Sequence, residues 1–354
     1  MRDARSSQGG FPASRGSAGG ASRAGHAQAP SQPGTASPAR PGAAARAGKK
    51  KAEPPGMKRL QSAGSMRRFA QQKRAAGKRI GFVPTMGALH EGHLSLIRKA
   101  RGQNDVVVLS IFVNPLQFGV GEDYGRYPRD LARDMDLARE GGVDAVFIPE
   151  VADLYPEGFT TRVSGGALGT RLCGTSRPGH FDGVCTVVMK LLGIVQPHRL
   201  YLGEKDAQQL IVLQRMVTDL NVDVRIVPCT TVREKDGLAL SSRNRYLGPE
   251  ERAQAPRLYQ ALRYAQREIL LRHERDTERV KEGMRALLAQ GERIAIEYIE
   301  IVDPETLLPL ATLSGRALIA LAVRLGETRL IDNILVNVPG GRMAETQGLP
   351  GRKR

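Results

Sequence analysis

The apolar and polar positions after residue 57 follow patterns that predict alternating strands and helices. Residues 106–113 form an apolar, mostly β-branched run broken only by Ser110, which is typical of a strand buried on both faces of a parallel sheet. Shorter apolar runs predict further strands, and apolar residues at three- and four-residue spacing predict helices between them. The predicted strands are 80–83, 106–113, 143–148, 200–202 and 223–227, and the predicted helices are 66–74, 93–102, 131–141, 187–195 and 208–220. This order indicates an α/β fold with a Rossmann-like parallel sheet and right-handed crossovers.

The pattern changes character after about residue 232. Residues 250–290 are charged and helical, and three later segments read as strands, the first of them by alternation of apolar and polar residues. These strands are 294–302, 317–323 and 328–335. We expect a smaller α+β domain with antiparallel strands, which would close over a bound ligand as a lid.

The amino-acid composition indicates a separate segment at each end of the chain. Residues 1–56 hold nine Lys or Arg, two acidic residues and almost no large apolar side chain, so they cannot bury enough surface to fold and should be disordered. They contain no apolar core of a secretory signal. We interpret them as an upstream extension or an over-long gene start in preference to a transit peptide. The expected division of the chain is an extension over 1–56, a Rossmann-like domain over 57–231, a lid over 232–341 and a flexible tail over 342–354.

The overall composition argues against several classes of protein. The formal net charge is +17, but aromatic residues make up only 5% of the chain and Trp is absent, whereas nucleic-acid-binding modules interleave basic residues with stacking aromatics. The sequence contains no run of eighteen apolar residues, so no membrane span is predicted. The three cysteines are far apart and lack zinc-site spacing. We therefore expect a reduced, cytoplasmic protein that binds neither nucleic acid nor membrane.

The stretch 81–94 carries the most informative candidate chemistry. It joins a predicted strand to a predicted helix, and His90 and His93 lie three residues apart at the helix start, so both rings can face the same space. Gly92 between them lets a ligand approach the backbone closely. A helix start also offers free N–H groups and the positive end of a dipole. These features suit a triphosphate attacked at its α-phosphorus; the alternative is a pair of surface or capping histidines.

Polar residues also follow three other predicted strands, where ligands bind in parallel sheets. Asn114 and Gln117 come after 106–113 and suit hydroxyl and carboxylate recognition, although an ordinary Asn-Pro turn explains them as well. Lys205 comes after 200–202 and can reach a phosphate, or it can be a solvated charge at a helix cap. After 223–227, a loop carries Ser241, Ser242 and Arg243. Two hydroxyls and a guanidinium can hold phosphate, although Ser-Ser-Arg is also a common turn.

In combination, these motifs resemble one known family. The two histidines and the later Ser-Ser-Arg loop resemble the HIGH and KMSKS motifs of the class I adenylyl-transfer superfamily. Within it, the sequence is similar to the pantothenate synthetase (pantoate–β-alanine ligase) family. The matching stretches occur in the family's order and together span about residues 57–340. They are 83–93, 112–118, 127–129, 177–183, 203–206, 208–209, 231–234 and 240–245.

The resemblance implies a reaction. The chain would be a ligase of coenzyme A biosynthesis that condenses (R)-pantoate with β-alanine to pantothenate through a pantoyl adenylate, releasing AMP and pyrophosphate from ATP. The resemblance also implies Mg²⁺ on the ATP phosphates and a homodimer. Another nucleotidyltransferase of the superfamily is the alternative. Such an enzyme would share the histidines but should lack the amides at Asn114, Gln117, Gln208 and Gln209.

The resemblance also assigns roles to individual residues. His90, His93 and Lys205 would be catalytic. ATP would be bound by Met86, Gly87, Ala88, Leu89, His90, Glu91, Gly92, His93, Gly203, Glu204, Lys205, Asp206, Val232, Leu240, Ser241, Ser242 and Arg243. Gln117, Gln209 and Asn114 would bind pantoate or β-alanine, with Tyr127, Arg177 and His180 as further candidates. Family members often carry adjacent acids after residue 129, where this sequence reads Arg133-Asp134, so Asp134 is the predicted metal ligand.

Overall fold

The computed structural model describes residues 56–338. The expected extension before this range and the tail after it lie outside the described residues. The two β-sheets lie within one compact unit of the chain. The division into a first domain and a lid at residue 231 stays a prediction.

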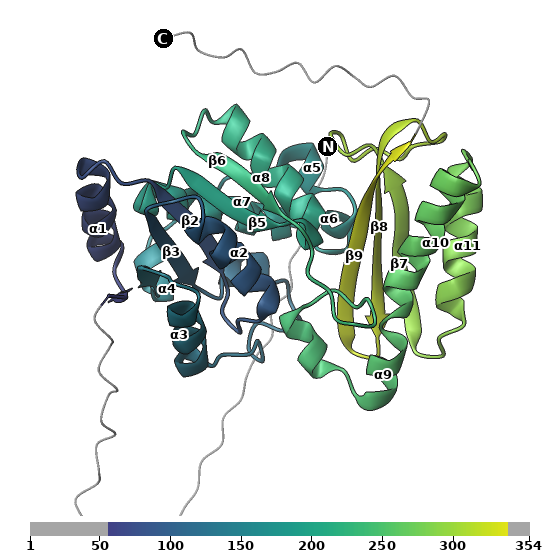
Figure 1. Cartoon of the computed structure of the whole chain (residues 1–354), viewed down its shortest axis with the longest axis horizontal. Coiled ribbons are helices and arrows are strands. Elements are labelled where there is room, and N and C mark those ends of the chain that lie inside the picture. The colour runs from purple at the N-terminus through teal and green to yellow at the C-terminus, as the bar shows by residue number, and fades with distance from the viewer. Residues whose placement is uncertain (1–55, 339–354) are drawn as a thin grey trace, which may run out of the picture. The chain divides into compact units, whose positions relative to one another are not determined.

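Six parallel strands form the larger sheet, in the order β1-β4-β3-β2-β5-β6 (Figure 1). The strands are β1 (Lys58–Leu60), β2 (Ile80–Thr85), β3 (Val106–Ile111), β4 (Ala145–Phe147), β5 (Arg199–Gly203) and β6 (Arg225–Cys229). The helices between them are α1 (Ala63–Ala75), α2 (Glu91–Arg101), α3 (Leu131–Glu140), α4 (Val151–Leu154), α5 (Gly166–Gly169), α6 (Cys173–Ser176), α7 (His180–Val195) and α8 (Ala207–Asp219). The predicted α/β fold with a parallel sheet is confirmed.

Apolar side chains cover both faces of this sheet. Met66 of α1, Leu191 of α7 and Leu213 of α8 pack with the strands on one face. Ile97 of α2 and Ala138 of α3 pack on the other. Burial on both faces explains why the strands read as nearly continuous apolar runs. Because the strands are parallel, the carboxyl ends of β2, β3 and β5 lie at one edge of the sheet. Polar residues at this edge come from the short 3₁₀ helices η1 (Pro115–Gln117), η2 (Glu204–Asp206) and η3 (Ser242–Tyr246).

Three antiparallel strands form the smaller sheet, in the order β7-β8-β9. Its elements are α9 (Pro249–Gln254), α10 (Arg257–Leu271), α11 (Thr277–Ala289), β7 (Ile294–Val302), β8 (Gly315–Leu325) and β9 (Thr328–Val338). Leu262 of α10 and Met284 of α11 pack against one face of this sheet, as Figure 1 shows at the yellow-green end of the chain. On the other face, Leu318 and Ala320 of β8 pack with Ile211 of α8. The smaller sheet is therefore packed directly against the larger part.

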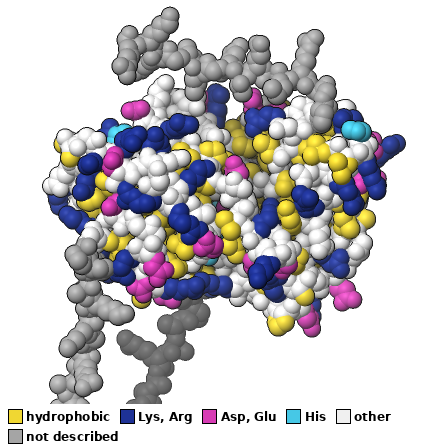
Figure 2. All heavy atoms as spheres, in the orientation of Figure 1, with side chains coloured by type: hydrophobic (Ala, Val, Ile, Leu, Met, Phe, Trp, Pro, Cys, Tyr) yellow, Lys and Arg dark blue, Asp and Glu magenta, His cyan; other side chains and the backbone are white. Residues whose placement is uncertain are grey.

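Three findings bear on the protein classes that the sequence argued against. Within residues 56–338, no helix combines the length and the apolar character that a membrane crossing needs. Figure 2 shows Lys and Arg side chains dispersed among acidic and uncharged residues on the face that it displays. The three cysteines, Cys173, Cys185 and Cys229, are buried and free.

Candidate active site

A cavity of about 410 Å³ lies where the carboxyl ends of β2 and β5 meet η3 and the smaller sheet. It brings together most residues that the sequence singled out. These are Met86, His90, Gly92, His93, Asn114, Gln117, Tyr127, Arg177, His180, Gly203, Lys205, Asp206, Gln209, Val232, Leu240, Ser241, Ser242 and Arg243. The predicted residues that do not line the cavity are Gly87, Ala88, Leu89, Glu91, Glu204 and Asp134.

The two histidines cap the helix that carries them. His90 is the N-cap of α2, and its Nδ1 accepts a hydrogen bond from the Gly92 N–H at 3.1 Å. The Nδ1 of His93 accepts from the His90 N–H at 3.3 Å, which completes a capping box. The ring centroids are 4.1 Å apart. Capping and cavity lining are therefore not alternatives here, because each ring uses one nitrogen for the helix and keeps the other.

These contacts fix the protonation of both rings. Burial, with the positive charge of Lys205 adding to it, lowers the pKa of His90 to about 4. Burial, His90 and Lys205 together lower the pKa of His93 to about 3. A neutral imidazole whose Nδ1 accepts a hydrogen bond must carry its proton on Nε2. At neutral pH the site thus holds two uncharged N–H donors, which suit stabilisation of developing negative charge more than proton abstraction.

The contacts of Asp134 favour a structural role, and the predicted metal-binding role stays a prediction. Its side chain is buried, and its carboxylate oxygens accept from the N–H groups of Ala88 at 2.8 Å and Leu89 at 2.7 Å. Ala88 has a φ of 52°, a conformation that costs energy for a residue with a side chain. Asp134 therefore holds the turn just before His90 and does not face the cavity as a metal ligand would. The described residues also contain no group of three or more His, Cys, Asp or Glu able to hold a metal ion.

We expect Asp134→Asn to lower turnover by about tenfold to a hundredfold, because a displacement of about 1 Å in a catalytic group can cost that much. The amide keeps the size of the carboxylate but turns an NH₂ group toward one of the two N–H donors. Asp136→Asn is the matched control, since Asp136 is exposed on the same helix and pairs with Arg139 at the surface. Steady-state turnover measured over a range of Mg²⁺ concentrations checks this. Recovery of activity at high Mg²⁺ would contradict the structural role, because it would identify a weakened metal ligand.

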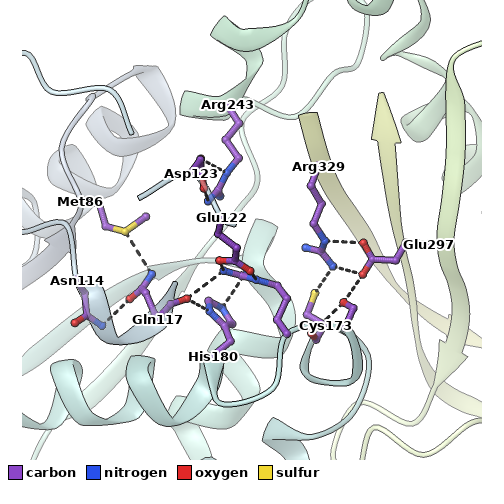
Figure 3. A network of polar contacts seen from close by, with 12 residues as sticks. Met86, Asn114, Gln117, Glu122, Asp123, Cys173, His180, Arg243, Glu297 and Arg329 are labelled. Carbon is purple, nitrogen blue, oxygen red and sulfur yellow. Dashed lines mark hydrogen bonds and ion pairs between the residues drawn. The ribbon is translucent and has the colours of Figure 1, made fainter. Parts of the chain in front are cut away.

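Gln117 lies in a network of polar contacts (Figure 3). Its Oε1 accepts from the Asn114 Nδ2 at 3.1 Å, and its Nε2 lies 3.3 Å from the Met86 sulfur. Asn114 has no free group to offer a ligand: its Nδ2 also donates to the Gly183 carbonyl, and its Oδ1 accepts from the Tyr155 hydroxyl at 2.7 Å. These contacts favour a role for Asn114 in orienting Gln117, and its predicted contact with substrate stays a prediction. The amide of Gln117 makes fewer hydrogen bonds than that of Asn114.

The backbone of Gln117 is fixed by a second set of contacts. The guanidinium of Arg177 pairs with both oxygens of Glu122 at 2.6 Å and donates to His180 Nε2 at 3.0 Å. Because a guanidinium can only donate, His180 Nε2 accepts and its Nδ1 donates to the Gln117 carbonyl at 2.8 Å. Burial, reinforced by the charge of Arg177, lowers the pKa of His180 to about 4. His180 is therefore a neutral group that holds the loop in place.

The cations of the cavity differ in how far they are neutralised. Arg243 donates through Nε and Nη2 to both oxygens of Asp123, at 2.9 and 2.8 Å. Ser242 donates to the Ala88 carbonyl at 3.2 Å, which ties η3 to the turn before His90. The ammonium of Lys205 lies 3.9 Å from Asp206 and makes no closer ion pair among the described residues. Lys205 is thus the more available positive charge.

The sequence motifs did not reveal the residues that the smaller sheet contributes. Arg329 of β9 pairs with both oxygens of Glu297 of β7 at 2.7 Å, and Figure 3 shows this pair facing Cys173. The Cys173 sulfur lies 3.1 Å from the Tyr298 hydroxyl. These residues line the cavity. A bulge between Ile296 and Tyr298 shifts the alternation of β7, and no motif in the sequence marks it.

Comparisons with known proteins agree on one family. A family model described as pantoate-beta-alanine ligase matches residues 58–335. The pantothenate synthetase of Thermotoga petrophila is 54% identical over 277 residues, which are 78% of this chain and 99% of that protein. The Aquifex aeolicus pantothenate synthetase is 54% identical over 76% of this chain and 95% of its own length.

Solved structures agree as well. The crystal structure of pantothenate synthetase from Thermus thermophilus has a TM-score of 0.74 at 50% identity, covering 78% of this chain and 99% of that one. The pantoate-beta-alanine ligase from Francisella tularensis, described as complexed with beta-gamma ATP and beta-alanine, has a TM-score of 0.65 at 37% identity. It covers 79% of this chain and 97% of its own.

Proposed function

Because the chain belongs to the pantoate-beta-alanine ligase family and is a ligase that forms pantothenate, we propose that it works through a pantoyl-adenylate intermediate at the cavity described above. The observation that carries this proposal is the pair of neutral histidines beside Lys205 in one cavity. Neutral donors and one available ammonium suit a reaction in which negative charge builds on phosphate. The predicted alternative, another nucleotidyltransferase, is not favoured by any observation.

The first step would be attack of a pantoate carboxylate oxygen on the α-phosphorus of ATP, with loss of pyrophosphate. His90 and His93 would donate from Nε2 to the phosphate oxygens as their charge increases. Lys205 and the Ser241–Arg243 loop would hold the phosphates, since hydroxyls and cations make charge-assisted hydrogen bonds to them. In the second step, the neutral amine of β-alanine would attack the activated carbonyl, and AMP would leave after the nitrogen has lost its proton.

Substrate recognition would fall to the neutral amides. Gln117 and Gln209 line the cavity, and amides can both donate to a carboxylate and accept from a hydroxyl. Gly203, Asp206 and the backbone at Val232 would hold ribose and adenine. Mg²⁺ would be carried mainly by the phosphates, as is usual for this ion. The protein would add little to this, because Glu122 and Asp123 in the cavity are already paired with arginines.

The family resemblance supports a homodimer, and the three free cysteines support a reduced, cytoplasmic location. We propose both on that basis, together with ATP, (R)-pantoate and β-alanine as the substrates. We propose that neither a nucleic acid nor a membrane is a partner of this protein.

The test is an isotope-exchange assay. Adenylate formation is reversible, so labelled pyrophosphate should enter ATP when pantoate is present and β-alanine is absent. Adding β-alanine should then give pantothenate and AMP in equal amounts. Exchange that does not need pantoate, or ADP as the product, would contradict the proposed mechanism.

A further inference from the structure

A single side chain of the smaller sheet binds the turn that carries Lys205. The Asn333 Nδ2 on β9 donates to the Glu204 carbonyl at 3.0 Å and to the Lys205 carbonyl at 2.8 Å. Within residues 56–338, no other side chain makes a hydrogen bond to the backbone of η2. The η2 helix also lacks a side-chain cap at its start. The amide of Asn333 is therefore the one polar side-chain clamp on this turn in the described part of the chain.

Asn333 is itself anchored by a buried ion pair. Both oxygens of the neighbouring Asp332 accept from the Arg233 guanidinium, at 2.6 and 3.0 Å, and one also accepts from the Asn333 N–H at 2.8 Å. The Asp332 side chain is only 2% exposed. The guanidinium of Arg233 also lies over the Tyr259 ring of α10, 4.0 Å from its centroid. Asn333 thus links the η2 backbone to a firmly held part of the smaller sheet.

The side chain of Lys205 has little to hold it apart from its backbone. Its nearest acidic partner, Asp206, is 3.9 Å away and half exposed. An ion pair of this length with a half-exposed partner contributes little. The reach of the ammonium into the cavity therefore depends on where the η2 backbone lies, and Asn333 sets that position.

We propose that Asn333 is a positioning residue for the adenylation step. It acts through Lys205, by holding the Glu204–Asp206 turn so that the ammonium meets the phosphates. This inference rests on the proposed function, which assigns Lys205 to the phosphates. It gives the smaller sheet a part in the chemistry beyond covering the cavity.

The first experiment replaces Asn333 in the full-length enzyme. Asn333→Ala should lower kcat for pantoate-dependent pyrophosphate exchange about tenfold to a hundredfold, with the KM for pantoate nearly unchanged. Asn333→Asp keeps the size of the side chain but faces two carbonyl oxygens with a carboxylate, so it should be at least as impaired. Asn337→Ala is the matched control, since Asn337 is an exposed Asn on the same strand. Wild-type exchange by Asn333→Asp would overturn the proposal, because only the size of the side chain would then matter.

A double-mutant cycle tests whether Asn333 acts through Lys205. In a Lys205→Ala background, adding Asn333→Ala should reduce exchange by less than about threefold, because the group being positioned is gone. A further loss as large as in the wild-type background would overturn the inference while leaving the role of Lys205 intact. If Lys205→Ala alone leaves exchange unchanged, the assignment of Lys205 in the proposed function fails, and the inference fails with it.

Discussion

His93→Ala should slow pantoyl-adenylate formation by about a hundredfold to a thousandfold, which is the usual cost of removing one donor to a developing negative charge. His93 lines the cavity with a neutral ring, and its Nε2–H would act as a donor mainly in the transition state as pyrophosphate leaves. The second step starts from an activated adenylate and attacks carbon, so it should depend on His93 much less. The measurement compares the overall reaction with pantothenate formation from chemically made pantoyl adenylate and β-alanine.

A second substitution separates catalysis from helix capping. His93→Gln keeps an acceptor at the third helical position for the His90 N–H, as in an ordinary capping box, but it removes the imidazole donor. We expect its stability at neutral pH to match wild type and its adenylation to stay impaired. His273→Asn is the control for losing an exposed histidine, since Asn tolerates the φ of 58° at that position. If pantothenate formation from the adenylate falls as far as the overall reaction does, His93 is not specific to adenylation.

The enzyme should lose stability steeply as the pH falls from about 6.5 toward 4. His90, His93 and His180 have folded-state pKa values lowered to about 4, 3 and 4, so the unfolded chain binds their protons first. Stability from a lowered pKa is complete above the unfolded value, here about 6.5, and is lost as the pH falls toward the folded one. Each histidine contributes up to about 1.4 kcal/mol per pH unit within this window. Asp134, whose pKa burial raises, opposes the trend in part.

Urea unfolding at a series of pH values checks this expectation. Acidic groups with lowered pKa values, such as Glu122 and Asp123, lose their contribution mainly below their ordinary range near 4. The slope between pH 6 and 5 therefore reports on the histidines. His93→Gln should reduce that slope by roughly a quarter to a third, since His198 also has a lowered pKa, and the exposed His273→Asn serves as the control. A flat stability between pH 6.5 and 5 would show that the rings take up protons in the folded protein.

The sequence was sufficient to predict a strand or a site residue where one physical rule decides its position. Strands buried on both faces must be apolar throughout, so β2 and β3 could be placed within two residues. Ligands of parallel sheets bind beyond the carboxyl ends of the strands, so residues far apart in the chain, such as His93 and Lys205, could be assigned to one site. They do line one cavity.

The parts that could not be predicted depend on contacts between distant residues. Helix α7 begins at His180, seven residues before the predicted start, after Gly179 in a left-handed conformation. Strand β1 has only three residues and is defined by its pairing with β4. Asp134 and Asn114 carry polar groups suited to a ligand, but the backbone and side chains around them use those groups. Asn333 reads as an ordinary polar position in an alternating strand, since nothing local marks the turn that it binds.

The order of the parallel sheet has a consequence for the folding of the chain. Strand β2 pairs with β3, which follows it closely, and also with β5, in which Arg199 pairs with Gly81. The β2–β3–β4 portion can therefore form while one edge of β2 stays unpaired. That edge pairs with β5, a strand more than a hundred residues later in the chain. Pairings this distant in sequence are slow, and an unpaired edge is prone to aggregation meanwhile. During refolding, we expect helical signal to return first and nucleotide binding last, because the cavity needs β5, η3 and finally Asn333 in place.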